Sequence, residues 1–225
     1  MTAASPACPL CAGVDGRPIA CDGRLYFRCP ECALVYLHPE QRIALADEKA
    51  QYALHENDPA DGRYRAFLSR SLDEVCERVQ LPARGLDFGC GPGPALVTMA
   101  REAGYAMDAY DPIYAPDACV FDRRYDFITC TEVAEHLFAP GVELDRLWSL
   151  LEPGGVLVVQ SARVLDDERF RSWHYRRDLT HVVFFADETF AWLASRWGAQ
   201  LCLPRRDVAV LVRPGAKAHF QGGDR

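Results

Sequence analysis

The sequence contains 225 residues, of which 49% are hydrophobic, enough for the buried core of one ordinary domain and a small appendage. Its 25 basic and 32 acidic side chains give a net charge of −7, which would repel a phosphate backbone and disfavours nucleic acid as a partner. It has no apolar stretch of about 20 residues that could span a bilayer, and its N-terminus lacks the basic and apolar regions of a signal peptide. We therefore expect a cytoplasmic protein without a membrane partner.

Two C-x-x-C pairs near the N-terminus are the first motif in the chain. The four residues are Cys8, Cys11, Cys29 and Cys32. The interval between the pairs falls in the range of four-cysteine zinc sites, and thiols in a reducing compartment serve as metal ligands rather than disulfides. Between the pairs, Asp22-Gly23 predicts a hairpin turn. We predict a zinc ribbon over residues 1–38 in which four thiolates leave no open position, so that the zinc is structural. An iron–sulfur or redox role is the alternative.

The next segments connect the ribbon to the main domain. Residues 39–62 are polar and are predicted to form a linker or a lid. From Tyr64 to Leu81, apolar residues recur at helical spacing, which predicts a helix over the edge of a sheet. The main domain is expected to occupy residues 63–213, and the glycine-rich residues 214–225 are expected to form a flexible tail.

A strand that runs into alternating glycines is the most informative local pattern. It is Leu86-Asp87-Phe88-Gly89-Cys90-Gly91-Pro92-Gly93. Glycines allow a sharp turn and a close approach of the backbone to a ligand, and the run 95–103 after Pro94 predicts a helix that ends at Gly104. A second strand, 105–110, ends at Asp111, whose carboxylate could accept hydrogen bonds from two ribose hydroxyls. Nicotinamide and flavin domains use a related loop, but here the third glycine comes too early. A strand-to-helix turn of another α/β protein is the remaining alternative.

Two further segments extend this pattern. Residues 125–130 form a strand-like run, and residues 151–159 read as the end of a helix, a turn and another strand. Together with Asp87, two residues before the first glycine, and Asp111, they resemble the class I S-adenosylmethionine (SAM) dependent methyltransferases over about residues 60–213. The resemblance implies an α/β fold with a Rossmann-like, seven-stranded sheet and SAM as the cofactor. The segment between Asp111 and the first of these runs is short for the family's third strand. The residues that the resemblance places at the cofactor are Asp87, Gly89, Cys90, Gly91, Gly93, Asp111, Pro112, Cys130 and Thr131.

Side chains capable of catalysis follow the fourth strand. If this segment is helical, Glu132, Glu135 and His136 share one face. Asp178 and His181 come after the fifth strand, where this family builds its acceptor pocket. The arrangement resembles two subfamilies, the ubiquinone-biosynthesis O-methyltransferases and the enzymes that methylate the terminal ribose of small RNAs. In both, the matching residues are associated with a divalent cation, so the resemblance implies a magnesium or manganese site. Its ligands would be Glu132, Glu135, His136 and His181.

Other readings of these residues stay open. Without a metal, His136 or His181 could act as the general base and Asp178 could orient it. An acid–histidine pair that only caps a helix or packs beneath the pocket is the structural alternative. We expect SAM-dependent O-methylation of a small molecule, with these three residues as the catalytic group. Methylation of RNA or protein bound by the ribbon, and non-catalytic SAM binding, are the alternative functions; no oligomeric state is predicted.

Overall fold

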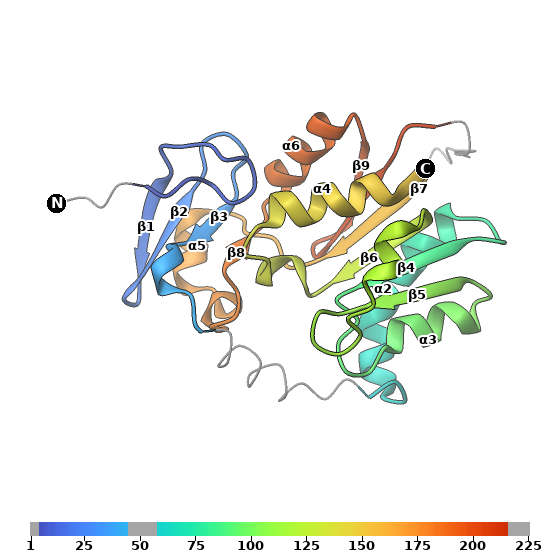
Figure 1. Ribbon diagram of the computed structural model, residues 1–225. Coiled ribbons are helices and arrows are strands. Elements are labelled where there is room, and N and C mark those ends of the chain that lie inside the picture. Colours follow the sequence, from blue (N-terminus) through green and yellow to red (C-terminus); the bar gives the residue numbers. More distant parts are fainter. Residues whose placement is uncertain (1–4, 45–57, 216–225) are drawn as a thin grey trace.

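The computed structural model describes residues 5–44 and 58–215, and it contains one large sheet with a smaller sheet beside it (Figure 1). The large sheet has six strands in the order β5-β4-β6-β7-β10-β9. These are β4 (Arg84–Phe88), β5 (Ala106–Tyr110), β6 (Tyr125–Thr131), β7 (Leu151–Gln160), β9 (Gln200–Arg205) and β10 (Val208–Val212). Strands β5, β4, β6 and β7 are parallel neighbours, and β10 and β9 continue the sheet in antiparallel pairing. This arrangement confirms the predicted Rossmann-like α/β fold class.

The sheet differs from the expected seven strands in the segment between β5 and β6. Here the chain forms a short 3-10 helix, η2 (Ala118–Asp122), and an isolated bridge between Asp111 and Ala115. Pro112 and Pro116 lie in this short segment, and proline lacks the N–H that a strand ladder needs. Strand β5 is therefore an edge of the sheet within the described part of the chain.

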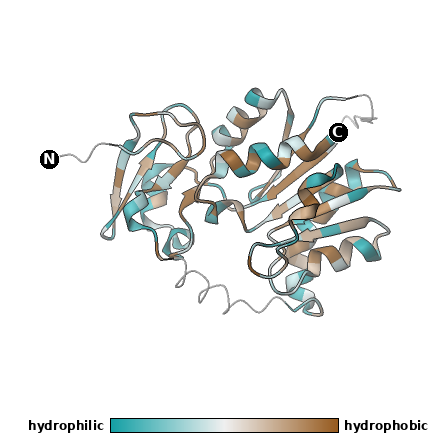
Figure 2. Cartoon of the chain, viewed as in Figure 1, coloured by the Kyte–Doolittle hydropathy of each residue, from teal (hydrophilic) through white to brown (hydrophobic). Residues whose placement is uncertain are grey.

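Helices cover both faces of the large sheet. They are α2 (Gly62–Arg78), α3 (Ala95–Glu102), α4 (Pro140–Leu150) and α6 (Asp187–Trp197). The short helix α5 (Asp167–Ser172) lies beside the small sheet instead (Figure 1). Val156 and Val158 of β7 pack with α2 and α3, whereas Leu157 and Val159 pack with α4 and α6. Strand β7 accordingly contains an unbroken apolar run, residues 156–159 (Figure 2), as expected for a strand that is buried on both faces. The helices predicted after Tyr64 and after the glycine loop are α2 and α3.

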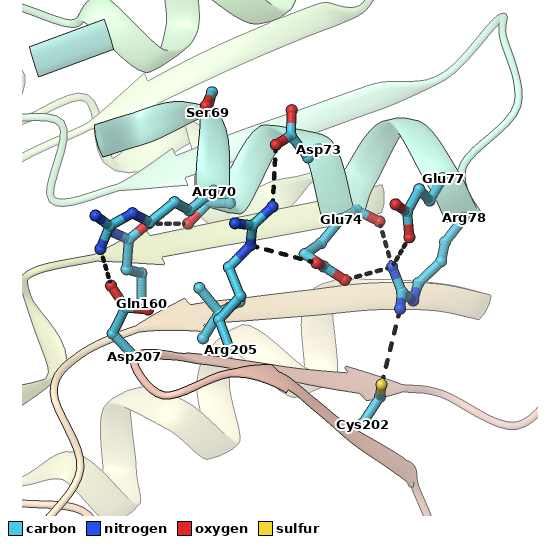
Figure 3. A network of polar contacts seen from close by, with 12 residues as sticks. Ser69, Arg70, Asp73, Glu74, Glu77, Arg78, Gln160, Cys202, Arg205 and Asp207 are labelled. Carbon is cyan, nitrogen blue, oxygen red and sulfur yellow. Dashed lines mark hydrogen bonds and ion pairs between the residues drawn. The ribbon is translucent and has the colours of Figure 1, made fainter. Parts of the chain in front are cut away.

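A polar network ties α2 to the end of the chain (Figure 3). Arg70 of α2 forms an ion pair with Asp207, which lies between β9 and β10. Arg205 of β9 lies 3.3 Å from Asp73 and 4.0 Å from Glu74 of the same helix. The network anchors α2 over the sheet, and the first turns of this helix form part of the cavity described below.

The small sheet joins the N-terminal segment to the main domain. Its strands, in order, are β1 (Arg17–Cys21), β2 (Arg24–Arg28), β3 (Val35–Leu37) and β8 (Val183–Phe184). Strands β1 and β2 form the predicted hairpin, with Asp22 and Gly23 both at positive φ, as a tight hairpin turn requires. Strand β3 pairs with β8, which lies far along the chain, and the buried side chains of the two parts form one continuous core.

Parts of the predicted connecting segment and tail fall outside the described residues, because residues 45–57 and 216–225 are not described. The described part of the connecting segment contains a 3-10 turn, η1 (Pro39–Gln41), and the start of α2. Among the helices of residues 5–44 and 58–215, none is long and apolar enough to cross a membrane.

Candidate active site

The glycine loop after β4 is shaped for close backbone approach. Gly89 has a φ of +82°, and a Cβ at this position would overlap the side chain of Val133. A residue with a side chain could therefore replace Gly89 only if the loop or Val133 moved. Asp87, at the end of the strand, is buried and accepts a hydrogen bond from the Thr129 hydroxyl at 2.7 Å. Burial raises the pKa of Asp87 to about 6.

Asp111 holds the loops at the end of β5 together. Its carboxylate accepts hydrogen bonds from the backbone N–H groups of Gly91 at 3.1 Å, Ile113 at 2.8 Å and Tyr114 at 3.0 Å. A carboxylate has about four lone-pair sites, so three backbone bonds leave room for roughly one more donor. Asp111 thus holds the glycine loop against the turn that follows β5. Its predicted contact with a ribose stays a prediction.

A cavity of about 870 Å³ opens at the carboxyl end of the parallel strands. Its volume lies within the range of small-molecule sites, and this edge of the sheet is where α/β proteins bind ligands. Residues of the predicted cofactor set that line it are Gly89, Cys90, Gly91, Asp111, Pro112 and Thr131. Three predicted catalytic residues, His136, Asp178 and His181, line the same cavity.

Three predicted cofactor residues are not in the wall of this cavity. Asp87 lines a small adjoining recess of about 20 Å³ together with Gly89 and Thr131. Gly93 and Cys130 line neither space. The Cys130 side chain is fully buried in the core that contains α4 and α6, because successive residues of a strand point to opposite faces. The predicted contact between Cys130 and the cofactor is therefore not supported.

Glu132 and Glu135 are brought together by a tight turn, and not by the helix that their spacing predicts. Glu132 follows β6 with a φ of +52°, and a 3-10 turn, η3 (Ala134–His136), comes next. The hydroxyl of Tyr175 donates to Glu135 and lies 3.2 Å from Glu132 Oε2. Burial, followed by the charge of Glu135, raises the pKa of Glu132 to about 8. Positive φ in a residue other than glycine is a strained conformation that often occurs at functional sites.

The two histidines face each other beside these carboxylates, with ring centroids 4.7 Å apart. The Nδ1 atom of His181 lies 2.7 Å from the carbonyl oxygen of Tyr175, and that of His136 lies 3.2 Å from the carbonyl oxygen of Thr180. A carbonyl only accepts, so each Nδ1 carries the hydrogen. The lone pair of neutral His181 is then on Nε2, 3.9 Å from Asp178. Burial lowers the pKa of His181 and favours this neutral form.

Glu135, His136 and His181 fit a metal ion better than the predicted four-residue set does. Their ligand atoms all lie within 4.8 Å of one another. Oε2 of Glu135 is buried and has no hydrogen-bond partner among the described residues, and a backbone carbonyl at each histidine Nδ1 is the arrangement that orients metal-binding histidines. Glu132 is outside this group and faces Tyr175 instead.

Tyr175 is the functional residue that sequence reasoning missed. It lies in a stretch rich in aromatic residues, and such rings commonly pack in a core. The neighbouring Phe170 and Phe184 are indeed buried core residues. Tyr175, in contrast, links both glutamates through its hydroxyl and His181 through its backbone. The only local signal was its position a few residues before His181.

The four N-terminal cysteines converge in a geometry that suits zinc. Their sulfurs lie within 4.8 Å of one another, with Cys8 and Cys32 at 3.6 Å and Cys11 and Cys29 at 3.4 Å. Tetrahedral zinc with Zn–S bonds of about 2.3 Å requires sulfurs about 3.8 Å apart. The four thiols therefore fit the predicted ion.

The two halves of this cluster share one backbone conformation. In the first, Cys8 accepts from the N–H of Ala12 and donates to Gly13; in the second, Cys29 accepts from Ala33 and donates to Leu34. Ala12 and Ala33 both have a φ near +60° (+61° and +59°). The repeated Cys-Pro-x-Cys-Ala sequence thus forms two equivalent knuckles.

Comparison with known proteins agrees with this geometry. Residues 60–202 match a family model described as a methyltransferase domain. The chain belongs to this methyltransferase family. The match spans the glycine loop, Asp111 and the carboxylate–imidazole cluster, and it confirms the resemblance to SAM-dependent methyltransferases.

Curated relatives point to the same family. The ubiquinone biosynthesis O-methyltransferase of Xylella fastidiosa (strain M23) is 32% identical over a region that covers 40% of this chain and 46% of that protein. The protein of the same name from Xanthomonas campestris pv. campestris (strain B100) is 31% identical, with 40% and 48% covered. The chain therefore spans about half the length of the curated relatives it matches.

A solved structure of a methyltransferase is also similar. It is the 1,6-didemethyltoxoflavin-N1-methyltransferase of Burkholderia thailandensis with bound 1,6-didemethyltoxoflavin and S-adenosylhomocysteine. The identity is 17% and the TM-score is 0.47, with 88% of this chain and 99% of the other covered.

Proposed function

We propose that this methyltransferase transfers the methyl group of SAM to a hydroxyl oxygen of a small molecule. The observation that carries the proposal is that one cavity joins the glycine loop to His136, Asp178 and His181. A cofactor held at the glycine loop and an acceptor held at the histidines would lie in the same cavity. The curated relatives are named as O-methyltransferases of ubiquinone biosynthesis, which favours oxygen as the acceptor atom.

The residues at the glycine-loop end fit SAM. Gly89 and Gly91 expose backbone at the cavity wall, and Asp111 lies where a ribose diol would need an acceptor. When bound, SAM supplies an electrophilic methyl group on its sulfonium. The acceptor must then present an oxygen that has lost, or is losing, its proton.

We infer that His181 takes that proton. Its Nδ1–H is held by the Tyr175 carbonyl, so Nε2 is the basic atom. A hydroxyl within hydrogen-bond reach of Nε2 would transfer its proton there as the bond between its oxygen and the methyl carbon forms. The carbon–sulfur bond of the sulfonium would break at the same time, and S-adenosylhomocysteine would be the leaving group. The buried Glu135 carboxylate beside the ring would stabilise the resulting imidazolium, and Asp178 lies near the same nitrogen.

A divalent cation at Glu135, His136 and His181 is the second candidate arrangement, because these ligand atoms already converge. A cation there would lower the pKa of an acceptor hydroxyl and would replace the histidine as the activating group. Magnesium or manganese is the ion that the subfamily resemblance implies. For the N-terminal cluster we propose a closed, structural zinc ion that takes no part in the chemistry.

The test has two stages. Calorimetric titration should first show micromolar binding of SAM and S-adenosylhomocysteine; absence of both would refute the methyltransferase assignment. Labelled methyl transfer is then measured with phenols, catechols and hydroxy acids, in chelator and with added magnesium or manganese. Transfer that persists in chelator supports the histidine base, and transfer that needs the cation supports the metal site. Cofactor binding without transfer to any acceptor would point to a SAM-binding protein that is not an enzyme for small molecules.

Paired variants assign the base. His181→Gln should lower the rate of transfer by about 10²-fold or more and leave S-adenosylhomocysteine affinity nearly unchanged. His174→Gln is the matched control, because His174 is an exposed histidine of the same segment. Equal activity of the two variants would remove His181 from the reaction.

A further inference from the structure

The described part of the N-terminal ribbon, residues 5–38, contributes no residue to the cavity wall, yet it contacts both segments that carry the acceptor end. One segment, 136–141, leads from His136 into α4. The other, 173–184, carries Tyr175, Asp178 and His181.

The first contact links the ribbon directly to the catalytic cluster through one backbone residue. The carbonyl of Val182 accepts a hydrogen bond from Leu37 of β3 at 2.8 Å. The N–H of the same residue donates to the carbonyl of Glu135 at 2.9 Å. Val182 follows His181, so strand β3 sets the position of His181 relative to Glu135.

The second contact is made by the hairpin turn. Asp22 forms an ion pair with Arg176, whose side chain is only 3% exposed. The Nε atom of Arg176 donates to the carbonyls of Phe170 and Arg171, each at 3.0 Å. The ring of Tyr26 packs edge-on against Phe170 with centroids 5.0 Å apart. The backbone on either side of Tyr175 is thus held against the ribbon.

The third contact is made by the first cysteine knuckle. The N–H of Gly141, near the start of α4, lies 3.3 Å from the carbonyl of Pro9. A Cβ on Gly141 would overlap the carbonyl oxygen of Leu10. Pro9 and Leu10 are the two residues between the first pair of zinc-ligand candidates, so the fold of the metal cluster determines whether α4 can dock here.

We propose that the ribbon is a positioning clamp for the acceptor end of the active site, and that Gly141, Arg176 and Val182 are the positioning residues through which it acts. This inference rests on the proposed function. Loss of the cluster or of a docking contact would let the two segments separate, which would displace His181 from Glu135. It would also loosen segment 173–184 itself, which would weaken the hydrogen bond between His181 and the Tyr175 carbonyl. The glycine loop is held instead by β5 and Val133, so cofactor affinity would be retained.

Gly141→Ala tests the clamp without changing a cysteine or a cavity residue. Gly62→Ala is the matched control, because a Cβ at Gly62 meets no atom within 4 Å. Three quantities are measured: the ¹⁵N signals of the His181 ring, amide exchange of residues 171–186, and affinity for S-adenosylhomocysteine. Gly141→Ala should replace the fixed Nδ1–H signal by an averaged one and accelerate exchange by about tenfold. Affinity should stay within about threefold of wild type.

Two further samples keep the test decisive if Gly141→Ala does not fold. Asp22→Asn changes an exposed side chain of the ribbon. This variant should also give an averaged His181 Nδ1–H signal and faster amide exchange of residues 171–186. Wild-type protein whose zinc has been removed by a chelator should do so as well. If the ribbon contributes to stability alone, these samples should unfold at a lower temperature while the His181 signal of the folded protein stays as in wild type. That result would overturn the proposed positioning role. Wild-type protein that fails to bind S-adenosylhomocysteine would instead refute the proposed function, while the His181 signals would still test the clamp.

Discussion

Tyr175 donates its phenolic hydrogen to Glu135, a carboxylate that is fully buried next to the cavity residues His136 and His181. The same oxygen lies 3.2 Å from Glu132. A phenol has one hydrogen and can serve one carboxylate at a time. The raised pKa of Glu132, about 8, agrees with a cluster in which the second acid keeps its own proton near neutrality. The three side chains therefore act as one hydrogen-bonded unit behind His181.

Tyr175→Phe removes this hydroxyl and keeps the ring that packs on His181 at a centroid distance of 4.2 Å. The buried Glu135 loses a donor, which should cost about 1–3 kcal/mol of the free energy of unfolding. Methyl transfer should fall by about 10²-fold, because the carboxylates no longer have a fixed geometry behind the base. Urea unfolding and the transfer assay measure the two effects. An active, equally stable variant would show that the hydroxyl is dispensable.

Asp87→Asn should change how stability depends on pH. The folded pKa of about 6 lies above the ordinary value of 3.8. Below the ordinary value, both the folded and the unfolded protein bind the proton. As pH rises from the ordinary value towards 6, the unfolded chain releases its proton before the folded protein does. The free energy of unfolding therefore falls by about 3 kcal/mol over this range, and the decrease is complete above the folded pKa. The asparagine variant should lack this loss.

Urea unfolding at about pH 4.5 and about pH 7.5 measures the difference. Asp15→Asn is the control, because Asp15 is exposed. If wild type and Asp87→Asn respond equally to pH, the buried carboxylate is not the titrating group.

Gly89→Ala should abolish cofactor binding. The substitution adds a Cβ at a φ of +82° and against the side chain of Val133. Calorimetry should show a loss of S-adenosylhomocysteine affinity of more than about tenfold. In the double variant with Val133→Ala, the collision is relieved but the unfavourable φ is not, so recovery should be partial. Full affinity in Gly89→Ala alone would contradict the shape assigned to the loop.

Cys11→Ser should release the metal of the N-terminal cluster. Elemental analysis should find about one zinc ion per wild-type chain and much less in the variant, because serine is a poor ligand for zinc. Cys21→Ser is the matched control, since Cys21 is outside the four-sulfur group. Equal metal content in the two variants would refute a zinc site at the four cysteines.

The order of strand, glycine loop, helix and second strand was readable from the sequence because each signal is local. Gly89, Asp111 and the helix after Pro94 depend on backbone freedom and on short apolar runs. The hairpin at Asp22 and the cysteine spacing are local in the same sense. The side of the sheet that Cys130 faces was not readable, because a strand buried on both faces has no alternation of polar and apolar residues.

The composition of the site was decided by tertiary structure. Tyr175 contacts Glu132 and Glu135, which lie 43 and 40 positions earlier in the sequence, and β3 pairs with β8 across a still longer interval. Such contacts depend on how complete elements pack, and no local propensity encodes them. The glycine loop and the cysteine knuckles could be predicted from local sequence, because their geometry is set within a few residues. Only the folded chain determined which side chains surround His181 and that the ribbon holds them, because those relationships exist between segments that meet only in the folded state.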